Sequence, residues 1–178
     1  MIDDDAAQRF MTAPQFAGTD PASLRALLNT LVEDRAPAGA VLLEQNQPND
    51  HLSILIGGTA TIERTFPDRP KEVLATLNAP ALFGTTSFFR PSPPTVTVRA
   101  ISEAWLLTLY HPAHDKLRAE NPRAAEALLL AVVRVLAERF DLVDKRVSDY
   151  LFAHADDHPK VNEWSGFRAR LFEEPAIE

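Results

Sequence analysis

The spacing of apolar residues changes twice along the chain. Residues 21–32 follow Asp20, which favours the start of a helix, and they carry apolar side chains at helical spacing: Leu24, Leu27, Leu28 and Leu31. From about residue 39 to residue 109 the apolar residues come in short runs, each bounded by Gly, Pro, Asn or Asp. Helical spacing returns after His111. The pattern predicts a short helix, a block of strands, and then further helices.

The middle block predicts a β-barrel. Its apolar runs have the length of strands, and the residues from Thr95 to Ala100 alternate strictly between polar and apolar. The clearest runs are Val41–Leu43, Leu52–Ile56, Val73–Leu77, Thr95–Ala100 and Ala104–Leu109. With the segments between them they make roughly seven or eight short strands, which suits a barrel or jelly roll. We therefore expect a mainly β fold with flanking helices, built as a double-stranded β-helix.

Two helices are predicted after the strands. Residues 111–121 make a short helix, and Pro122, at a position that favours a helix start, opens a long one that runs to about Leu151. Along the long helix, apolar residues recur at alternating spacings of four and three, as in a coiled coil. These residues are Leu129, Val133, Leu136, Phe140, Val143, Val147 and Tyr150.

This stripe is longer than one subunit can cover. A helix of about 30 residues is ~45 Å long, whereas a globule of 178 residues has a radius of gyration of roughly 16 Å. We expect the first two turns, which are apolar on nearly all sides, to pack on the barrel. Beyond them we expect a parallel homodimer, with packing on the chain's own barrel as the alternative. The predicted dimer interface is Leu136, Phe140, Val143, Val147 and Tyr150.

Length and composition fit one domain with a substantial core. The chain has 178 residues, of which 46% are apolar. We divide it into an N-terminal extension (1–20), a barrel domain with its long helix (21–152) and a C-terminal tail (153–178) that can form a short helix. The sequence has no cysteine, which removes disulfides and thiolate ligands.

The charge of the chain argues against nucleic acid as a partner. The net charge is −7 and the pI is near 5.2, whereas phosphate backbones are bound through clustered Lys and Arg. The first residues are acidic and lack the basic and apolar segments of a signal peptide. No run of about 18 apolar residues is present to span a bilayer. We expect a cytoplasmic protein that binds neither nucleic acid nor a membrane.

One segment has the outline of an anion-binding loop. Residues 82–100, LFGTTSFFRPSPPTVTVRA, begin with a glycine turn before a short helical stretch whose backbone N–H groups could meet a phosphate. The segment resembles the phosphate-binding cassette of the cyclic-nucleotide-binding domain in the catabolite-activator (CRP/FNR) superfamily. The residues that match the pattern, in register and without a gap, are Phe83, Gly84, Pro93, Thr97, Val98 and Ala100.

The resemblance covers about residues 24–152 and includes the order of helix, barrel, short helix and long helix. In the first hairpins, Gln45 stands where the family usually has a glycine. The positions that fit the family there are Gly39, Glu44, Asp50, Leu52, Ile54 and Gly58. The resemblance implies a jelly-roll barrel of the cyclic-nucleotide-binding type followed by a dimerisation helix.

Two departures from the cassette pattern change the functional expectation. In the family, a cassette glutamate hydrogen-bonds the ribose hydroxyl and an arginine neutralises the cyclic phosphate; the matching positions here are Thr85 and Pro94. Proline also lacks the N–H that could face the phosphate. A buried charge without its partner costs about 3–5 kcal/mol, so affinity falls on the order of a thousandfold or more. We expect no binding of cyclic AMP or cyclic GMP in the usual mode.

Other groups of the loop could still hold a ligand. In this alternative the domain senses a cyclic nucleotide or another small ligand through backbone groups and hydroxyls, with Arg90 meeting the anion. Arg99 is expected to point away from the loop, because side chains alternate along a strand. Phe88 and Phe89 are expected to fill the core or the pocket. The candidate ligand-binding residues are Gly84, Thr85, Thr86, Ser87, Arg90, Pro94 and Thr95.

No enzymatic activity, metal or cofactor is predicted. A cupin-type metalloenzyme needs two or three converging histidines and a carboxylate, whereas the histidines here are spread over turns, helix starts and the tail: His51, His111, His114, His154 and His158. A DNA-binding regulator is disfavoured because the segment after the long helix is acidic and short for a helix-turn-helix domain. The tail stripe of Trp164, Phe167 and Leu171 either packs on the barrel or docks a protein partner. We expect a stand-alone regulatory or interaction module.

Overall fold

The computed structural model describes residues 2–90 and 92–153, in which it places eight strands, five α-helices and one short 3-10 helix. The chain divides into two compact units, residues 1–135 and 136–178, and all strands lie in the first. The helices are α1 (Asp4–Met11), η1 (Pro14–Phe16), α2 (Pro21–Leu28), α3 (Thr85–Phe89), α4 (His111–Glu120) and α5 (Pro122–Ala153). The strands are β1 (Val32–Ala36), β2 (Val41–Leu43), β3 (His51–Gly57), β4 (Thr59–Phe66), β5 (Arg69–Asn78), β6 (Ala81–Phe83), β7 (Thr97–Ala100) and β8 (Ala104–Tyr110).

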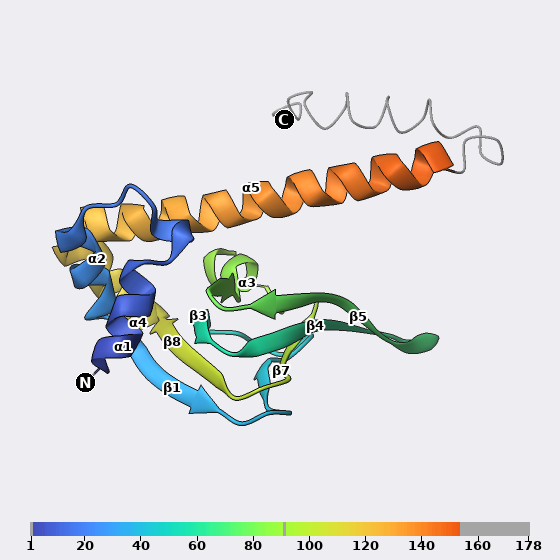
Figure 1. The fold of residues 1–178 in the computed structure, drawn as a ribbon, viewed down its shortest axis with the longest axis horizontal. Helices are drawn as coiled ribbons and strands as arrows, with labels where there is room; N and C mark the ends of the chain where they lie inside the picture. Colours follow the sequence, from blue (N-terminus) through green and yellow to red (C-terminus); the bar gives the residue numbers. More distant parts are fainter. Residues whose placement is uncertain (1, 91, 154–178) are drawn as a thin grey trace. The chain divides into compact units, whose positions relative to one another are not determined.

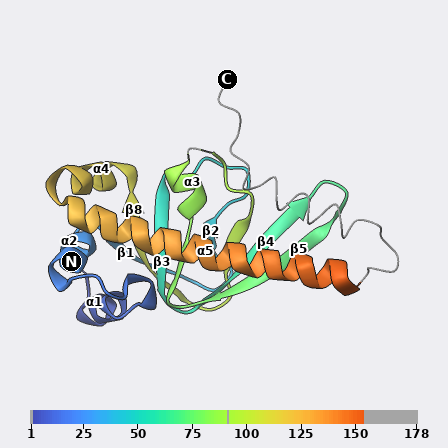
Figure 2. The same cartoon turned by 90° about the horizontal axis from the view of Figure 1, so that it is seen from above.

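The strands form two four-stranded antiparallel sheets, in the orders β1-β8-β3-β6 and β2-β7-β4-β5 (Figure 1). Helices α1, α2 and α4 gather at one end of the strands, as both views show (Figure 2). Sequence neighbours are distributed between the sheets, as in a jelly roll. The prediction of a mainly β jelly-roll barrel with a long C-terminal helix is confirmed.

Two apolar clusters make up the core, and β3 contributes to both. Leu52, Ile54 and Ile56 belong to the cluster shared with the helices, whereas Leu55 belongs to the cluster between the two sheets. Strand β8 is buried in the same way along almost its whole length. This explains why the run Leu52–Ile56 shows little alternation in sequence, because both faces of the strand are covered.

The N-terminal segment contributes to the core instead of lying outside it. Helix α1 was not predicted; it begins after Asp3, whose side chain accepts a hydrogen bond from the backbone N–H of Asp5. Phe10 in this helix is 0% exposed and its ring lies 4.8 Å from that of Phe16. Residues 4–16, in the predicted N-terminal extension, therefore form a helical layer that packs on the core.

Two predicted boundaries are wrong. The helix that starts after Asp20 ends at Leu28, and Val32 already belongs to β1, where it pairs with Thr108 of β8. Strand β7 begins at Thr97 and not at Thr95. In both cases the pattern of apolar residues extends beyond the hydrogen-bonded element. Periodicity alone therefore misplaced the end of the helix and the start of the strand.

The long helix α5 agrees with its prediction, and residues 154–178 lie outside the described part of the chain. The tail stripe and the two tail histidines, His154 and His158, lie in that outside region. In the described residues, no helix is both long enough and apolar enough to pass through a membrane.

The buried N-terminal helix leads to a test of stability. Replacing Phe10 by alanine removes a ring that has no exposed surface and leaves a cavity, so the free energy of unfolding should fall by about 3–5 kcal/mol. Gln8→Ala, at an exposed position of the same helix, is the matched control and should change it by less than about 0.5 kcal/mol. Urea unfolding followed by circular dichroism measures both. A Phe10 loss below about 1 kcal/mol would show that α1 is not part of the cooperative core.

Candidate functional site

The cassette begins at a sharp turn between β6 and α3. Gly84 has φ 75°, and a Cβ atom added there would lie 2.8 Å from the carbonyl oxygen of His51, so the turn requires glycine. Asn49 braces the turn, because its Nδ2 donates to the His51 carbonyl (2.7 Å) and to Ser87 Oγ (2.9 Å). Ser87 Oγ donates in turn to the Gly84 carbonyl (3.2 Å). The turn is thus fixed by hydrogen bonds within the protein.

Asn49 lies outside the cassette in sequence but contacts its turn, and the sequence analysis missed it. Its Oδ1 is buried and has no hydrogen-bond partner among the described residues. It lies in the loop before β3, far in sequence from α3. The only sequence signal for it is an asparagine shortly before a strand. The brace makes it part of the site.

The predicted site residues fall into two groups. Thr85, which is 2% exposed, Ser87 and Pro94 are buried, so the positions that matched the family's glutamate and arginine lie inside the protein. Thr86, Arg90 and Thr95 are exposed. The Pro94 carbonyl accepts a hydrogen bond from the N–H of Asn46 (2.8 Å), which ties this end of the cassette to the first hairpin.

Arg99, near the end of the cassette, has partners outside the Gly84 turn. Its Nε lies 3.3 Å from Glu63 Oε2, and its Nη1 donates to the Gly39 carbonyl (2.9 Å). Lys71 Nζ donates to the same Glu63 oxygen (3.0 Å). Burial alone would raise the pKa of Glu63, but the hydrogen bonds from Lys71 and Arg99 outweigh it and lower that pKa. The sequence placed Arg99 away from the loop and missed its carboxylate partner.

A cluster of aromatic rings fixes the other end of α3. Phe88 stacks face to face on His111, with ring centroids 4.2 Å apart and planes 2° apart, and meets the edge of His114 at 5.3 Å. Phe88 is buried in the core, as expected, whereas Phe89 is 38% exposed. Burial, and then the charge of Arg118, lower the pKa of His114. These two histidines support the cassette helix by packing.

In the part of the chain that the structure describes, no three His, Cys, Asp or Glu side chains converge as metal ligands.

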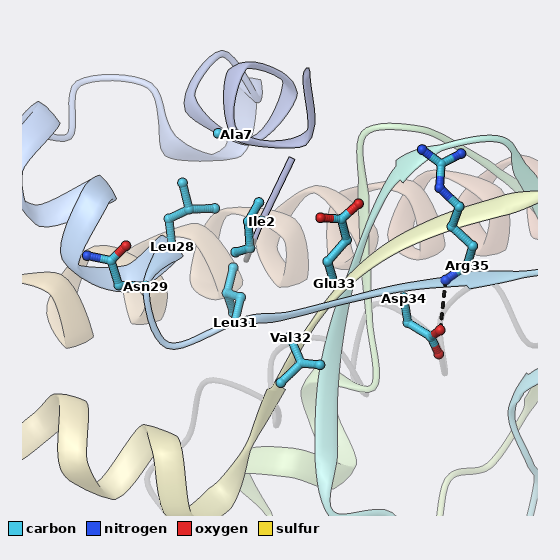
Figure 3. A pocket seen from close by; sticks show the side chains of 9 residues that line it. All are labelled: Ile2, Ala7, Leu28, Asn29, Leu31, Val32, Glu33, Asp34 and Arg35. Atoms are coloured by element: carbon cyan, nitrogen blue, oxygen red, sulfur yellow. Dashed lines mark hydrogen bonds between the residues drawn. The ribbon is translucent and has the colours of Figure 1, made fainter. Parts of the chain in front are cut away.

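A separate cavity of about 810 Å³ lies beside β1, α1 and α2 (Figure 3). The two carboxylates that line it already have partners. Glu33 accepts from Trp105 Nε1 (2.7 Å) and from the N–H of Asp3 (2.8 Å), and Asp34 accepts from the N–H of Arg35 (2.8 Å). The cavity involves none of the cassette residues.

The barrel, the glycine turn and the short helix after it define a cyclic-nucleotide-binding type of regulatory domain. The family model for the "Cyclic nucleotide-binding domain" matches residues 33–121. The chain belongs to this family, in the CRP/FNR group.

Relatives with regulatory names support this placement. The chain is 30% identical over 137 residues to the "CRP-like cAMP-activated global transcriptional regulator" of Mycobacterium tuberculosis, which covers 77% of this chain and 59% of that protein. It is 29% identical over 121 residues to a cyclic nucleotide-gated potassium channel of Rhizobium etli, covering 68% of this chain and 32% of the channel. The chain thus spans little more than half of the mycobacterial relative.

Solved structures agree with the fold. The N-terminal domain of a transcriptional regulator from Streptomyces coelicolor is 31% identical, with a TM-score of 0.63 over 76% of this chain and 94% of that chain. A cyclic nucleotide-binding domain from Methylobacillus flagellatus reaches a TM-score of 0.72 over 80% of both chains at 20% identity, and supports the fold alone.

The Glu63 ion pairs lead to a prediction about pH. The folded pKa of Glu63 lies below its ordinary 4.5, so the ion pairs stabilise the fold above about pH 4.5 and are lost as the pH falls through the folded pKa. Glu63→Gln should therefore lower the free energy of unfolding by about 1–3 kcal/mol at pH 7, and by much less near pH 3.

Denaturant unfolding at the two pH values measures the difference. Glu72→Gln is the control, because Glu72 is half exposed and 4.0 Å from Arg69, and its loss should cost less than about 1 kcal/mol. An equal loss for Glu63→Gln at both pH values would contradict the ion-pair account.

Proposed function

We propose that this chain is a regulatory domain whose cassette has lost the two ionic contacts to a cyclic nucleotide, so that it does not bind cyclic AMP or cyclic GMP in the usual mode. The observation that carries the proposal is the burial of Thr85 and Pro94 at the positions that match the family's glutamate and arginine. A hydroxyl and a proline ring there can neither neutralise a phosphate nor replace a carboxylate. The proposal assigns the domain no catalytic step.

No described cation takes the place of the missing arginine. Arg99 is engaged by Glu63 and by the Gly39 carbonyl. Arg90, the other candidate, is exposed and follows the last residue of α3. An anion bound in the cradle, by which we mean the Gly84 turn and the first N–H groups of α3, would lie at the other end of that helix. Without its cation the cradle offers backbone groups and hydroxyls only, which supports a loss of affinity on the order of a thousandfold.

A second candidate keeps the sensor role, and two observations favour it. The name of the mycobacterial relative describes a protein that cAMP activates. In addition, the buried Asn49 Oδ1 has no described partner and lies in the side chain that also contacts Ser87, so a ligand with a hydrogen-bond donor could satisfy it. In this candidate, the domain binds a cyclic nucleotide or another small molecule through a modified cassette.

We also propose that the domain acts as a parallel homodimer through α5. The face of the helix that packs in the core is made of Ala124, Leu128, Ala131 and Val132. The coiled-coil stripe lies on another face and is exposed: Leu129, Val133, Leu136, Phe140 and Val143 are 39–57% exposed. The first two turns pack in the core through Leu128 and Val132, as expected, whereas the stripe residues Leu129 and Val133, with Leu130, are exposed there. A second copy of the stripe would bury these residues.

Binding of cyclic nucleotides tests the proposed function directly. Isothermal titration calorimetry with cyclic AMP and cyclic GMP should give no dissociation constant tighter than roughly 1 mM, because both ionic contacts are missing. A constant at or below about 10 μM for either nucleotide would overturn the proposal and establish the sensor role.

Restoring the contacts provides the complementary test. Thr85→Glu combined with Pro94→Arg should create binding of cyclic AMP at least tenfold tighter than the wild type shows, since each charged hydrogen bond contributes about 1.5–3 kcal/mol. Thr86→Glu with Thr95→Arg places the same two residues at exposed neighbouring positions and should have no effect. If neither pair gains affinity, the cradle is closed for reasons beyond the two missing side chains.

The dimer is tested by a charge in the stripe. Phe140→Asp should dissociate the dimer while the barrel stays folded, because burying an unpaired carboxylate in each subunit costs several kcal/mol. Leu142→Asp is the matched control: Leu142 is 48% exposed on the same helix but lies off the stripe, so the dimer should survive. Multi-angle light scattering at about 50 μM distinguishes the two states. A monomeric wild type at that concentration would disprove the dimer, and a dimeric Phe140→Asp variant would move the interface elsewhere.

A further inference from the structure

A second cavity, of about 430 Å³, lies where the C-terminal end of α3 meets α4 and the start of α5. The residues that matter in it are Phe89, His114, Arg118, Ala125, Glu126 and Leu129. Its volume is within the range of about 300–1,000 Å³ that is usual for small-molecule sites. It lies at the opposite end of α3 from the Gly84 turn, so it is distinct from the anion-binding turn, although Phe89 belongs to the cassette segment.

One wall of the cavity is apolar and includes two rings at right angles. Phe89 and His114 are 5.5 Å apart between ring centroids, with planes at 86°. Ala125 continues this wall from α5, followed by Leu129, which is 49% exposed. Such a corner favours a flat apolar group, because an aromatic ring can stack on one ring while its edge meets the face of the other.

The cavity also presents a cation without a partner. Among the described residues the Arg118 guanidinium forms no ion pair or hydrogen bond, although Lys116 on the same helix lies 4.0 Å from Glu120. The charge of Arg118 is close enough to His114 to contribute to the lowered pKa of that imidazole. Glu126 is the carboxylate of the lining. A planar guanidinium beside an apolar wall is suited to a carboxylate, which it can bind with two parallel hydrogen bonds.

We propose that this cavity binds a small aromatic carboxylate, with its ring against Phe89 and His114 and its carboxylate on Arg118. The proposal does not depend on whether the cassette binds a cyclic nucleotide. Its ligand would contact α3, α4 and α5 together, because the lining comes from all three helices. Phe88, next to Phe89, stacks on His111, so the occupied cavity would also hold the cassette helix against α4.

Titration of the full chain with naphthoate and with naphthamide tests the proposal, since the two molecules share a ring system and differ in charge. Calorimetry should show saturable binding of naphthoate, and naphthamide should bind at least tenfold more weakly, the loss expected for a charged hydrogen bond. Arg118→Gln, at an exposed position, should weaken naphthoate to the level of naphthamide and leave naphthamide unchanged. Lys116→Gln, an exposed cation of the same helix outside the cavity, should leave both affinities unchanged.

The apolar wall is tested by filling it. Ala125→Leu should weaken both compounds by a similar factor, and backbone amide shifts in the nuclear magnetic resonance spectrum should move at Phe89 and Ala125 when naphthoate is added to the wild type. Leu129 is left unchanged in these variants because it also belongs to the proposed dimer stripe. Absence of saturable naphthoate binding would overturn the proposal. Equal effects of Arg118→Gln and Lys116→Gln, or shifts confined to the Gly84 turn, would do the same.

Discussion

The burial of β3 and β8 on both faces is the constraint on which the rest of this structure depends. A strand that has apolar cover on each side must be sandwiched between two layers, since its backbone groups pair within the sheet and its side chains leave in both directions. Here one layer is the second sheet, and the other consists of α1, α2 and the helices after β8. The cassette depends on this arrangement, because β6 pairs with β3 and Gly84 turns directly against the His51 carbonyl. The position of α3 therefore follows from the core before any ligand is considered.

Much of this fold could be predicted from local pattern, and the failures have a common physical origin. The apolar runs located the strands, and the heptad spacing located α5, because those signals arise within single elements. Helix α1 was missed because its apolar stripe, Ala6, Ala7, Phe10 and Met11, spans only two turns of a segment that begins with acidic residues. The Glu63–Arg99 pair was missed because it joins residues of β4 and β7, and it depends on a register that no local signal fixes. The brace from Asn49 to Ser87 is of the same kind.

The backbone of the cassette turn is determined by packing within the barrel. Its glycine is required by the close approach of the His51 carbonyl, and its helix is held by Phe88 on His111, so both features serve the packing of the barrel. Thr85 and Pro94 are accommodated within that packing as buried residues. On the proposed function, the domain keeps the backbone of the turn while the side chains that would recognise a phosphate are replaced. The resemblance in sequence identified the loop and its register, whereas the commitment of Arg99 to Glu63 became evident only in three dimensions.

The short contact between Asp34 and Arg35 has a consequence for the behaviour of the molecule in concentrated solution. Strand β1 is the edge of its sheet, and an edge strand with free outward N–H groups is a template on which another chain can add a strand. The Arg35 N–H is already bound by the carboxylate of Asp34. An incoming strand would have to displace that carboxylate and would meet its negative charge. At this residue the edge is in this way less open to the addition of another strand, which is the first step of growth into a fibril.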